Sequence, residues 1–92
     1  DDNAPRITSP LRGVAHAVRT QKPEPLVLRA EAAAGTRTIY WFADDALVGQ
    51  SAPGEGITWL PPLAQSGKRH TLRAVSDQGQ SETREITADI IP

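Results

Sequence analysis

Two adjacent aspartates, Asp44 and Asp45, are the residues whose type and spacing come nearest to a chemical site. Carboxylate oxygens are the ligands that Ca²⁺ prefers, and Asp77 or Glu55 would add to the pair if their loops converged. Calcium takes about six to eight oxygens, however, and no D-x-D-x-D-G pattern is present. The pair also lies between two apolar runs, where aspartate is a favoured turn residue because it caps local backbone donors. We therefore predict a turn here, with a calcium site as the alternative.

The residue types that perform catalysis are present without the neighbours that would activate them. None of the serines lies in a G-x-S-x-G motif or begins an S-x-x-K motif: Ser9, Ser51, Ser66, Ser76 and Ser81. The absence of cysteine excludes disulfides, thiolate chemistry and zinc sites of the cysteine type. His16 and His70 are not spaced as a metal pair. We therefore expect no catalytic residue, cofactor or metal in this chain.

The length and charge of the chain restrict the classes of protein to which it could belong. With 92 residues and no initiator methionine, residues 1–92 are expected to form a single domain of a longer protein. Ten basic and eleven acidic residues leave a net charge of −1, which argues against a general nucleic-acid binder. The longest basic cluster, Lys68-Arg69-His70, is too short for a polybasic membrane patch. No apolar run approaches the ~20 residues that span a bilayer.

The elements that position these residues are expected to be strands. Eight prolines and seven glycines interrupt the chain, which leaves little room for helices of ordinary length. Alternating or short apolar segments bounded by turn residues indicate strands over residues 5–10, 13–19, 26–32, 37–43, 46–50, 56–61, 69–75 and 81–91, the second of them weakly patterned. The segment VSDQGQS predicts a hairpin between the last two strands. About seven short strands predict an all-β, immunoglobulin-like antiparallel sandwich.

Alternation sorts the large side chains onto two faces of these strands. The residues that share the inward parity form the predicted core, with one tryptophan on each sheet: Ile39, Trp41, Ile57, Trp59 and Leu72. The alternative for a tryptophan is an exposed platform that stacks on a sugar ring. His70 stands where sandwich domains often carry a corner tyrosine, and we expect it to make a polar contact with the loop over residues 64–68.

The outward parity of the strand at 37–43 carries two more aromatic residues, Tyr40 and Phe42. With Val75 they would form the apolar centre of an interaction patch that has Arg37 and Arg73 at its rim. Packing against a neighbouring domain would explain the same residues. A bulge in the strand would exchange the two faces, because a slip of one residue turns every side chain over.

Several motifs in order resemble the C-terminal domain of bifunctional penicillin-binding proteins of the 1C type. The family pattern combines an opening I-x-S-P-x-x-G, a W-F-x-D turn, a W-x-P segment and a G-x-H-x-L-x-V-x-D-x-x-G ending. It falls here on Ile7, Ser9, Pro10, Gly13, Trp41, Phe42, Asp44, Trp59, Pro61, Gly67, His70, Leu72, Ala74, Asp77 and Gly79. The sequence departs from it at Asp45, where glycine is common, and in the two basic residues between Gly67 and His70.

The resemblance implies a context that the residues alone do not. Parent proteins of this type are inner-membrane enzymes with a glycosyltransferase and a transpeptidase domain that build peptidoglycan in the periplasm. The C-terminal domain contains neither active site, and the S-x-x-K, S-x-N and K-T-G motifs are missing here. We expect a periplasmic, non-catalytic accessory module whose partner is the transpeptidase domain or another periplasmic protein. The alternative is a peptidoglycan-binding module that uses exposed aromatic residues.

Overall fold

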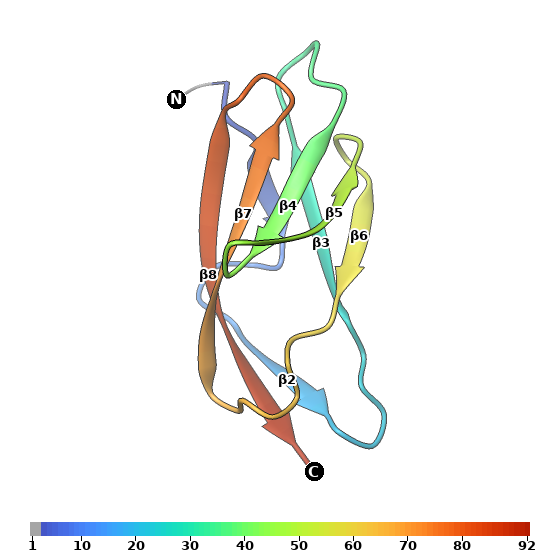
Figure 1. The fold of residues 1–92 in the computed structure, drawn as a ribbon, viewed down its shortest axis with the longest axis vertical. Coiled ribbons are helices and arrows are strands. Elements are labelled where there is room, and N and C mark those ends of the chain that lie inside the picture. The colour runs from blue at the N-terminus through green and yellow to red at the C-terminus, as the bar shows by residue number, and fades with distance from the viewer. Residues whose placement is uncertain (1–2) are drawn as a thin grey trace.

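The computed structural model describes residues 3–92, and these form two packed β-sheets with no helix (Figure 1). The prediction of an all-β, immunoglobulin-like sandwich is confirmed. The strands are β1 (Arg6–Ser9), β2 (Ala15–Arg19), β3 (Leu26–Glu31), β4 (Ile39–Ala43), β5 (Ala46–Ser51), β6 (Gly56–Trp59), β7 (Lys68–Ser76) and β8 (Ser81–Ile91). Among the described residues, no helix is long and apolar enough to cross a membrane.

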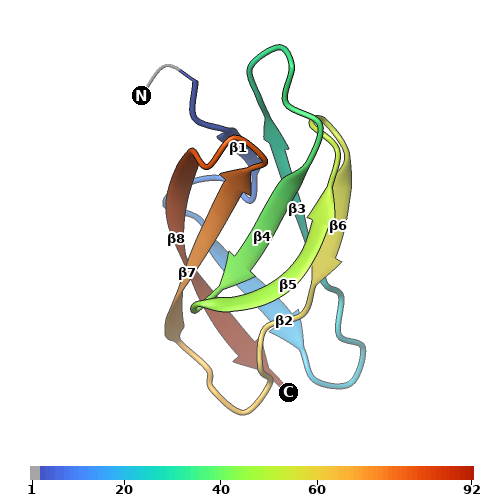
Figure 2. The same cartoon turned by 45° about the horizontal axis from the view of Figure 1, so that its top comes forward.

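The strands divide unequally between the two sheets. The smaller sheet has the order β1-β3-β6 and the larger sheet the order β2-β8-β7-β4-β5. All pairs are antiparallel except β2 and β8, which run parallel. Figure 2 shows β5 at the edge of the larger sheet, beside β6 of the smaller one.

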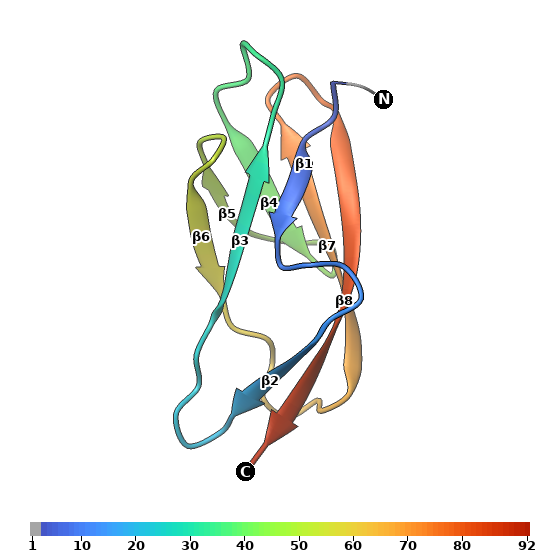
Figure 3. The same cartoon turned by 180° about the vertical axis from the view of Figure 1, so that it is seen from behind.

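The parallel pair arises because the N-terminal segment changes sheets. Strand β1 pairs with β3, and the chain then crosses to the larger sheet, where β2 lies along the end of β8 (Figure 3). Pro10 cannot continue the β1 ladder, since it has no N–H, and Gly13 takes a left-handed φ of 76° in the crossing. The crossing keeps the direction of the chain, so β2 arrives parallel to β8.

The core lies between the sheets and follows the alternation of the sequence. Along β3, Leu26, Leu28 and Ala30 are buried, and the residues between them are exposed. Ile39, Trp41 and Leu72 of the larger sheet have no exposed surface. The side chains of the predicted core on β6, which belongs to the smaller sheet, are partly buried and pack against this cluster: Ile57 and Trp59.

Both predicted turns form, and each has the residues that its geometry requires. Asp44 and Asp45 connect β4 to β5 as a two-residue hairpin with φ values of 48° and 71°. Positive φ at both central positions defines the type I′ turn, in which aspartate is tolerated better than most residues. Gly79 supplies the positive φ, 83°, in the hairpin between β7 and β8. The interpretation of the aspartate pair as a turn is therefore confirmed.

Two charged side chains of β8 join the sheets where β1 approaches. The Glu82 carboxylate accepts a hydrogen bond from the Ile7 N–H at 2.6 Å. The Arg84 guanidinium donates to the Pro10 carbonyl at 2.8 Å. Both bonds are partly buried and link positions far apart in the chain, so they hold the N-terminal strand against the last one. The sequence did not single out either residue.

Changing Glu82 to alanine is expected to lower the free energy of unfolding by about 1–3 kcal/mol, since it leaves a shielded backbone donor without its charged acceptor. The Ile7 amide should exchange its hydrogen faster. Glu85→Ala on the same strand is the matched control, because the Glu85 side chain is exposed and makes no hydrogen bond within residues 3–92. Urea unfolding and amide exchange measure both effects. Equal losses in the two variants would contradict this role.

Candidate interaction surface

Most residues of the predicted interaction patch lie on the outward face of the larger sheet. Tyr40 lies opposite Val75 and Phe42 opposite Arg73, in the unbroken register of β4 and β7. Residues directly opposite in antiparallel strands project to the same face with side chains in reach of each other. Four of the five predicted residues therefore lie side by side on this face.

Arginine covers part of the aromatic surface. The Arg73 guanidinium lies over the Phe42 ring, 5.0 Å from its centroid, within the range of a cation–π interaction. Phe42 and Val75 are half-buried, and Tyr40 keeps 36% of its surface exposed. An exposed aromatic residue beside an arginine is a combination enriched at the centres of protein interfaces.

Leu47 enlarges this surface and was missed from the sequence. It is 62% exposed and pairs with Phe42 across β4 and β5. A shift in register between Trp41 and Phe42 leaves Val48 as an extra residue on β5, so the bulge lies on the edge strand and the parity of β4 is kept. The signal was available, because a two-residue turn at 44–45 places residue 47 opposite residue 42. We call Tyr40, Phe42, Leu47, Arg73 and Val75 the aromatic patch.

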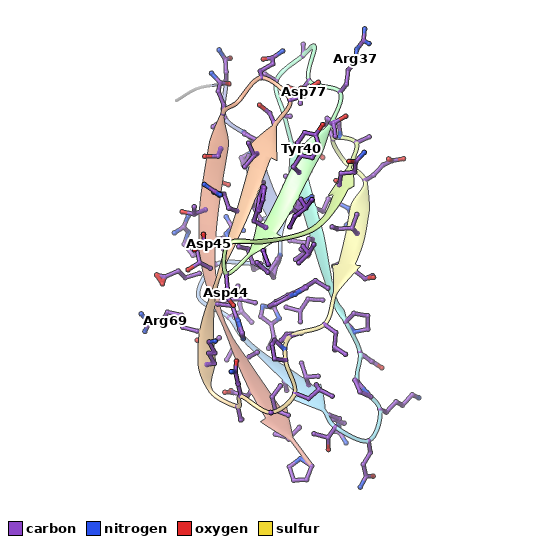
Figure 4. All side chains as sticks on the ribbon, in the orientation of Figure 1. Arg37, Tyr40, Asp44, Asp45, Arg69 and Asp77 are labelled. Atoms are coloured by element: carbon purple, nitrogen blue, oxygen red, sulfur yellow. The ribbon has the colours of Figure 1, made fainter. Side chains whose placement is uncertain are left out.

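Arg37 does not join the aromatic patch. Figure 4 shows its side chain at one end of the domain, pointing away from Tyr40. Its N–H instead approaches both carboxylate oxygens of Asp77 at 3.3–3.4 Å, and the Asp77 N–H donates to the Thr38 carbonyl at 3.0 Å. Arg37 precedes β4 in the loop after β3, and this local contact with the β7–β8 turn places it beyond the strand.

Asp44 links the β4–β5 turn to β7. Its Oδ2 lies 2.6 Å from His70 Nδ1, and its Oδ1 accepts the Thr71 N–H at 2.9 Å. The Asp44 N–H donates to the Thr71 carbonyl, also at 2.9 Å. An ionised carboxylate only accepts hydrogen bonds, so the His70 proton on this side resides on Nδ1.

These contacts lower the pKa of the Asp44 carboxyl group. Burial raises the pKa of Asp44, but the hydrogen bonds from His70 and Thr71 and the electrostatic attraction of His70 and Lys68 lower it by more. The pKa of Asp44 therefore lies below its ordinary value of 3.8. The carboxylate stays ionised at neutral pH, and it acts as a brace between two strands.

The expected partner of His70 was wrong. The ring is fully buried and contacts Asp44, not the loop over residues 64–68. Ala43 lies opposite Leu72 in the register, so the next residue, Asp44, comes beside Thr71 and within reach of His70. The Trp59 ring meets the imidazole edge-on, with centroids 5.3 Å apart and planes at 78°. Trp59 is partly buried and packs against the core cluster.

The acidic residues considered for calcium do not converge. Asp44 follows the end of β4, whereas Asp77 follows β7 and lies beside Thr38 at the start of β4, so the length of β4 separates the two turns (Figure 4). The Asp44 carboxylate already accepts hydrogen bonds from His70 and Thr71. Asp45 is its only acidic neighbour in the sequence. Within residues 3–92, no group of three or more histidine, aspartate or glutamate side chains could hold a metal ion.

The fold resembles that of a known class of small domains. The chain is a small fibronectin III-like sandwich, and solved fibronectin(III)-like modules of Clostridium thermocellum CbhA resemble it with a TM-score of 0.70. That match covers 96% of this chain and 99% of the other at 15% identity, so it bears on the fold alone.

The sequence places the chain within one family of such domains. The family model of the penicillin-binding protein C-terminus matches residues 1–87, so the chain belongs to the Penicillin-Binding Protein C-terminus Family. The resemblance seen in the sequence motifs is therefore confirmed. A search of curated proteins gives no match.

Proposed function

We propose that this domain is a non-catalytic accessory module of a periplasmic peptidoglycan synthase. Its aromatic patch docks onto the transpeptidase domain of the parent chain or onto another periplasmic protein. Membership of the Penicillin-Binding Protein C-terminus Family supports the cell-wall context. The lack of a catalytic motif in the sequence and the exposed apolar side chains of the aromatic patch support a binding role.

The observation that carries the docking proposal is the composition of the aromatic patch. Exposed Tyr40 and Leu47 flank a Phe42 ring that Arg73 already holds in place. Aromatic and arginine side chains lose little freedom when such a preformed arrangement is buried, and these residue types dominate binding energy in protein interfaces.

Changing Tyr40 and Phe42 together to serine is expected to weaken binding to the isolated transpeptidase domain at least tenfold. Truncation of central aromatic residues typically costs about 2–4 kcal/mol of binding free energy. Isothermal titration calorimetry with the purified domain measures the dissociation constant. Val27→Ser is the matched control, because Val27 is an exposed apolar strand residue, 38% accessible, on the smaller sheet. Unchanged binding by the double variant would remove the patch from the proposal.

Peptidoglycan binding is the alternative that the same reagents test. It needs an aromatic face open to a sugar ring, whereas Arg73 covers Phe42 and His70 meets Trp59. Tyr40 is the remaining exposed ring. Sedimentation with insoluble peptidoglycan should leave the chain in the supernatant. Cosedimentation that is lost in Tyr40→Ser would favour the glycan-binding alternative.

A further inference from the structure

The first half of β8 has an unpaired edge. Strand β8 runs from Ser81 to Ile91, but β2 pairs only with its last part, Thr87 to Ile91. Residues 81–86 have β7 on one side, and no other strand in the described part of the chain pairs with them. Figure 3 shows β2 beginning only partway along β8.

The hydrogen bonds at the two ends of the β7–β8 hairpin show which peptide groups face this edge. The Gln80 carbonyl accepts the Ser76 N–H at 2.8 Å, and the Ala88 carbonyl accepts the Gly67 N–H at 2.8 Å. The register between the strands is continuous from one end to the other. Backbone N–H and C=O groups alternate in direction along an antiparallel strand. Those of the even-numbered residues of β8 therefore point toward β7.

The backbone N–H and C=O groups of the odd-numbered residues of β8 therefore point away from β7. The end of β8 confirms this alternation, because the Ile91 carbonyl accepts the Thr20 N–H just beyond β2 at 2.8 Å. The backbone groups of Thr83 and Glu85 point in this same direction, where β8 has no neighbouring strand. Their N–H and C=O groups are thus available to another strand.

The edges formed by β1, β5 and β6 are blunted, and β2, the remaining edge strand, has only five residues. Pro5 and Pro10 bracket β1, and β6 has only four residues before Leu60 and the Pro61-Pro62 pair. On β5 the bulge at Val48 disturbs the ladder. Prolines, short strands and bulges are the usual protection against unwanted strand pairing. The free part of β8 lacks these features and belongs to a long, regular strand.

A groove of about 500 Å³ follows this edge, between β8 and the crossing from β1 to β2. Thr83 and Glu85 line one side, Arg12 lies in the crossing, and Arg69 of β7 stands opposite Thr87. Figure 4 shows Arg69 extending outward from its strand. Both arginines are exposed, and neither forms an ion pair with a carboxylate of residues 3–92. With Glu85 the groove has one more positive than negative side chain.

We propose that this groove binds an extended peptide segment with acidic side chains, which adds to β8 as a short strand. Its backbone pairs with Thr83 and Glu85, and its carboxylates meet Arg12 and Arg69. A small anion would use the arginines but not the alternating backbone donors and acceptors, whereas a peptide uses both. This inference does not depend on the aromatic patch, which lies over β4, β5 and β7.

The direct test titrates the blocked peptide acetyl-Val-Asp-Val-Glu-Val-amide into the isotope-labelled chain and follows the amides by NMR. We expect saturable shifts at Thr83 and Glu85, and at least tenfold slower hydrogen exchange of these two amides at saturation. A peptide with lysine at both acidic positions should bind at least tenfold more weakly. Two further peptides keep the side chains and carry N-methyl groups at either the odd or the even positions. One of the two should not bind, because its methyl groups lie on the edge that faces β8 and prevent the ladder.

Two protein variants test the same site. Thr83→Pro deletes the N–H that faces the groove and removes no hydrogen bond to β7, so it should abolish peptide binding in a folded chain. If that variant does not fold, Arg12→Glu combined with Arg69→Glu changes only exposed side chains and should weaken binding at least tenfold. Arg37→Glu is the control, since it lies at the far end of the domain (Figure 4).

Three results would overturn the proposal. The first is the absence of saturable binding at millimolar peptide. The second is undiminished binding of both N-methylated peptides, which would reduce the site to charge attraction. The third is a set of shifts centred on Tyr40 and Val75, which would place the peptide on the aromatic patch. Loss of transpeptidase-domain binding in the Tyr40 and Phe42 variant is a separate outcome, so the two proposals fail independently.

Discussion

Replacing Trp41 by alanine is expected to lower the free energy of unfolding by about 3–5 kcal/mol, the largest loss from any single side chain of this domain. Trp41 has no exposed surface, and its indole N–H donates to the Ser51 hydroxyl at 3.1 Å. The substitution opens a cavity between the sheets and leaves a buried hydroxyl without its donor. A loss of this size is a large fraction of the ~5–15 kcal/mol that stabilises a typical domain.

Trp59→Ala is the matched comparison, because it removes the same side chain from the other sheet. Trp59 is only partly buried and meets His70 at one ring edge, so its loss should cost about 1–3 kcal/mol. Urea unfolding followed by far-ultraviolet circular dichroism measures both variants. If Trp41→Ala does not fold, Trp41→Phe takes its place in the comparison of stability losses at the two positions. A larger loss for Trp59 than for Trp41 would contradict the arrangement of the core.

Changing Asp44 to asparagine is expected to destabilise the domain by about 1–2 kcal/mol at neutral pH. Asparagine tolerates the left-handed φ of 48°, so the turn itself is kept. What is lost is the charged acceptor of the bonds from His70 and Thr71. Hydrogen bonds to a charged group contribute more than neutral ones, although partial exposure of the Asp44 side chain, 39%, reduces the effect.

The pH dependence of this loss follows from the lowered pKa of Asp44. A carboxyl group with a lower pKa in the folded state stabilises the fold above its unfolded pKa, and the contribution disappears as the pH falls through the folded value. The difference in stability between the parent chain and Asp44→Asn should therefore be full above about pH 5 and shrink below the ordinary value of 3.8.

Asp45→Asn is the control on the same turn. Asp45 also has a left-handed φ, 71°, but its side chain makes no hydrogen bond within residues 3–92. Its substitution should change stability by less than about 0.5 kcal/mol at every pH. Chemical unfolding at a series of pH values from neutral to acidic measures both variants. Parallel curves for the two would show that Asp44 does not couple the turn to His70.

The sequence determined the fold class and most of the strands, because the alternation of apolar residues is a local signal. The inward parity of Leu26, Leu28 and Ala30 and of Ile39 and Trp41 is visible without any long-range information. Turn chemistry is equally local, which is why Asp44-Asp45 and the glycine of the last hairpin were identified correctly. The family was also accessible, since its motifs are spread along the chain in order.

Only the tertiary structure decided what these elements meet. The aspartate of the turn reaches His70 because β4 and β7 are neighbours, although 26 positions separate the two residues. Arg37 leaves the aromatic patch because the end of β4 lies beside the β7–β8 turn. Neither strand pairing nor loop direction is encoded in the spacing of single residues.

The crossing of the N-terminal segment between sheets is the clearest case of a feature that local pattern could not supply. Pro10 and Gly13 mark a break in the sequence, but they do not say which sheet receives β2 or how far along β8 it pairs. That depends on packing across the whole sandwich, including the bonds from Glu82 and Arg84 to the N-terminal strand. The unpaired edge of β8 exists because β2 begins at Ala15, which lies opposite Thr87, so the residues of β8 before Thr87 have no partner on that side.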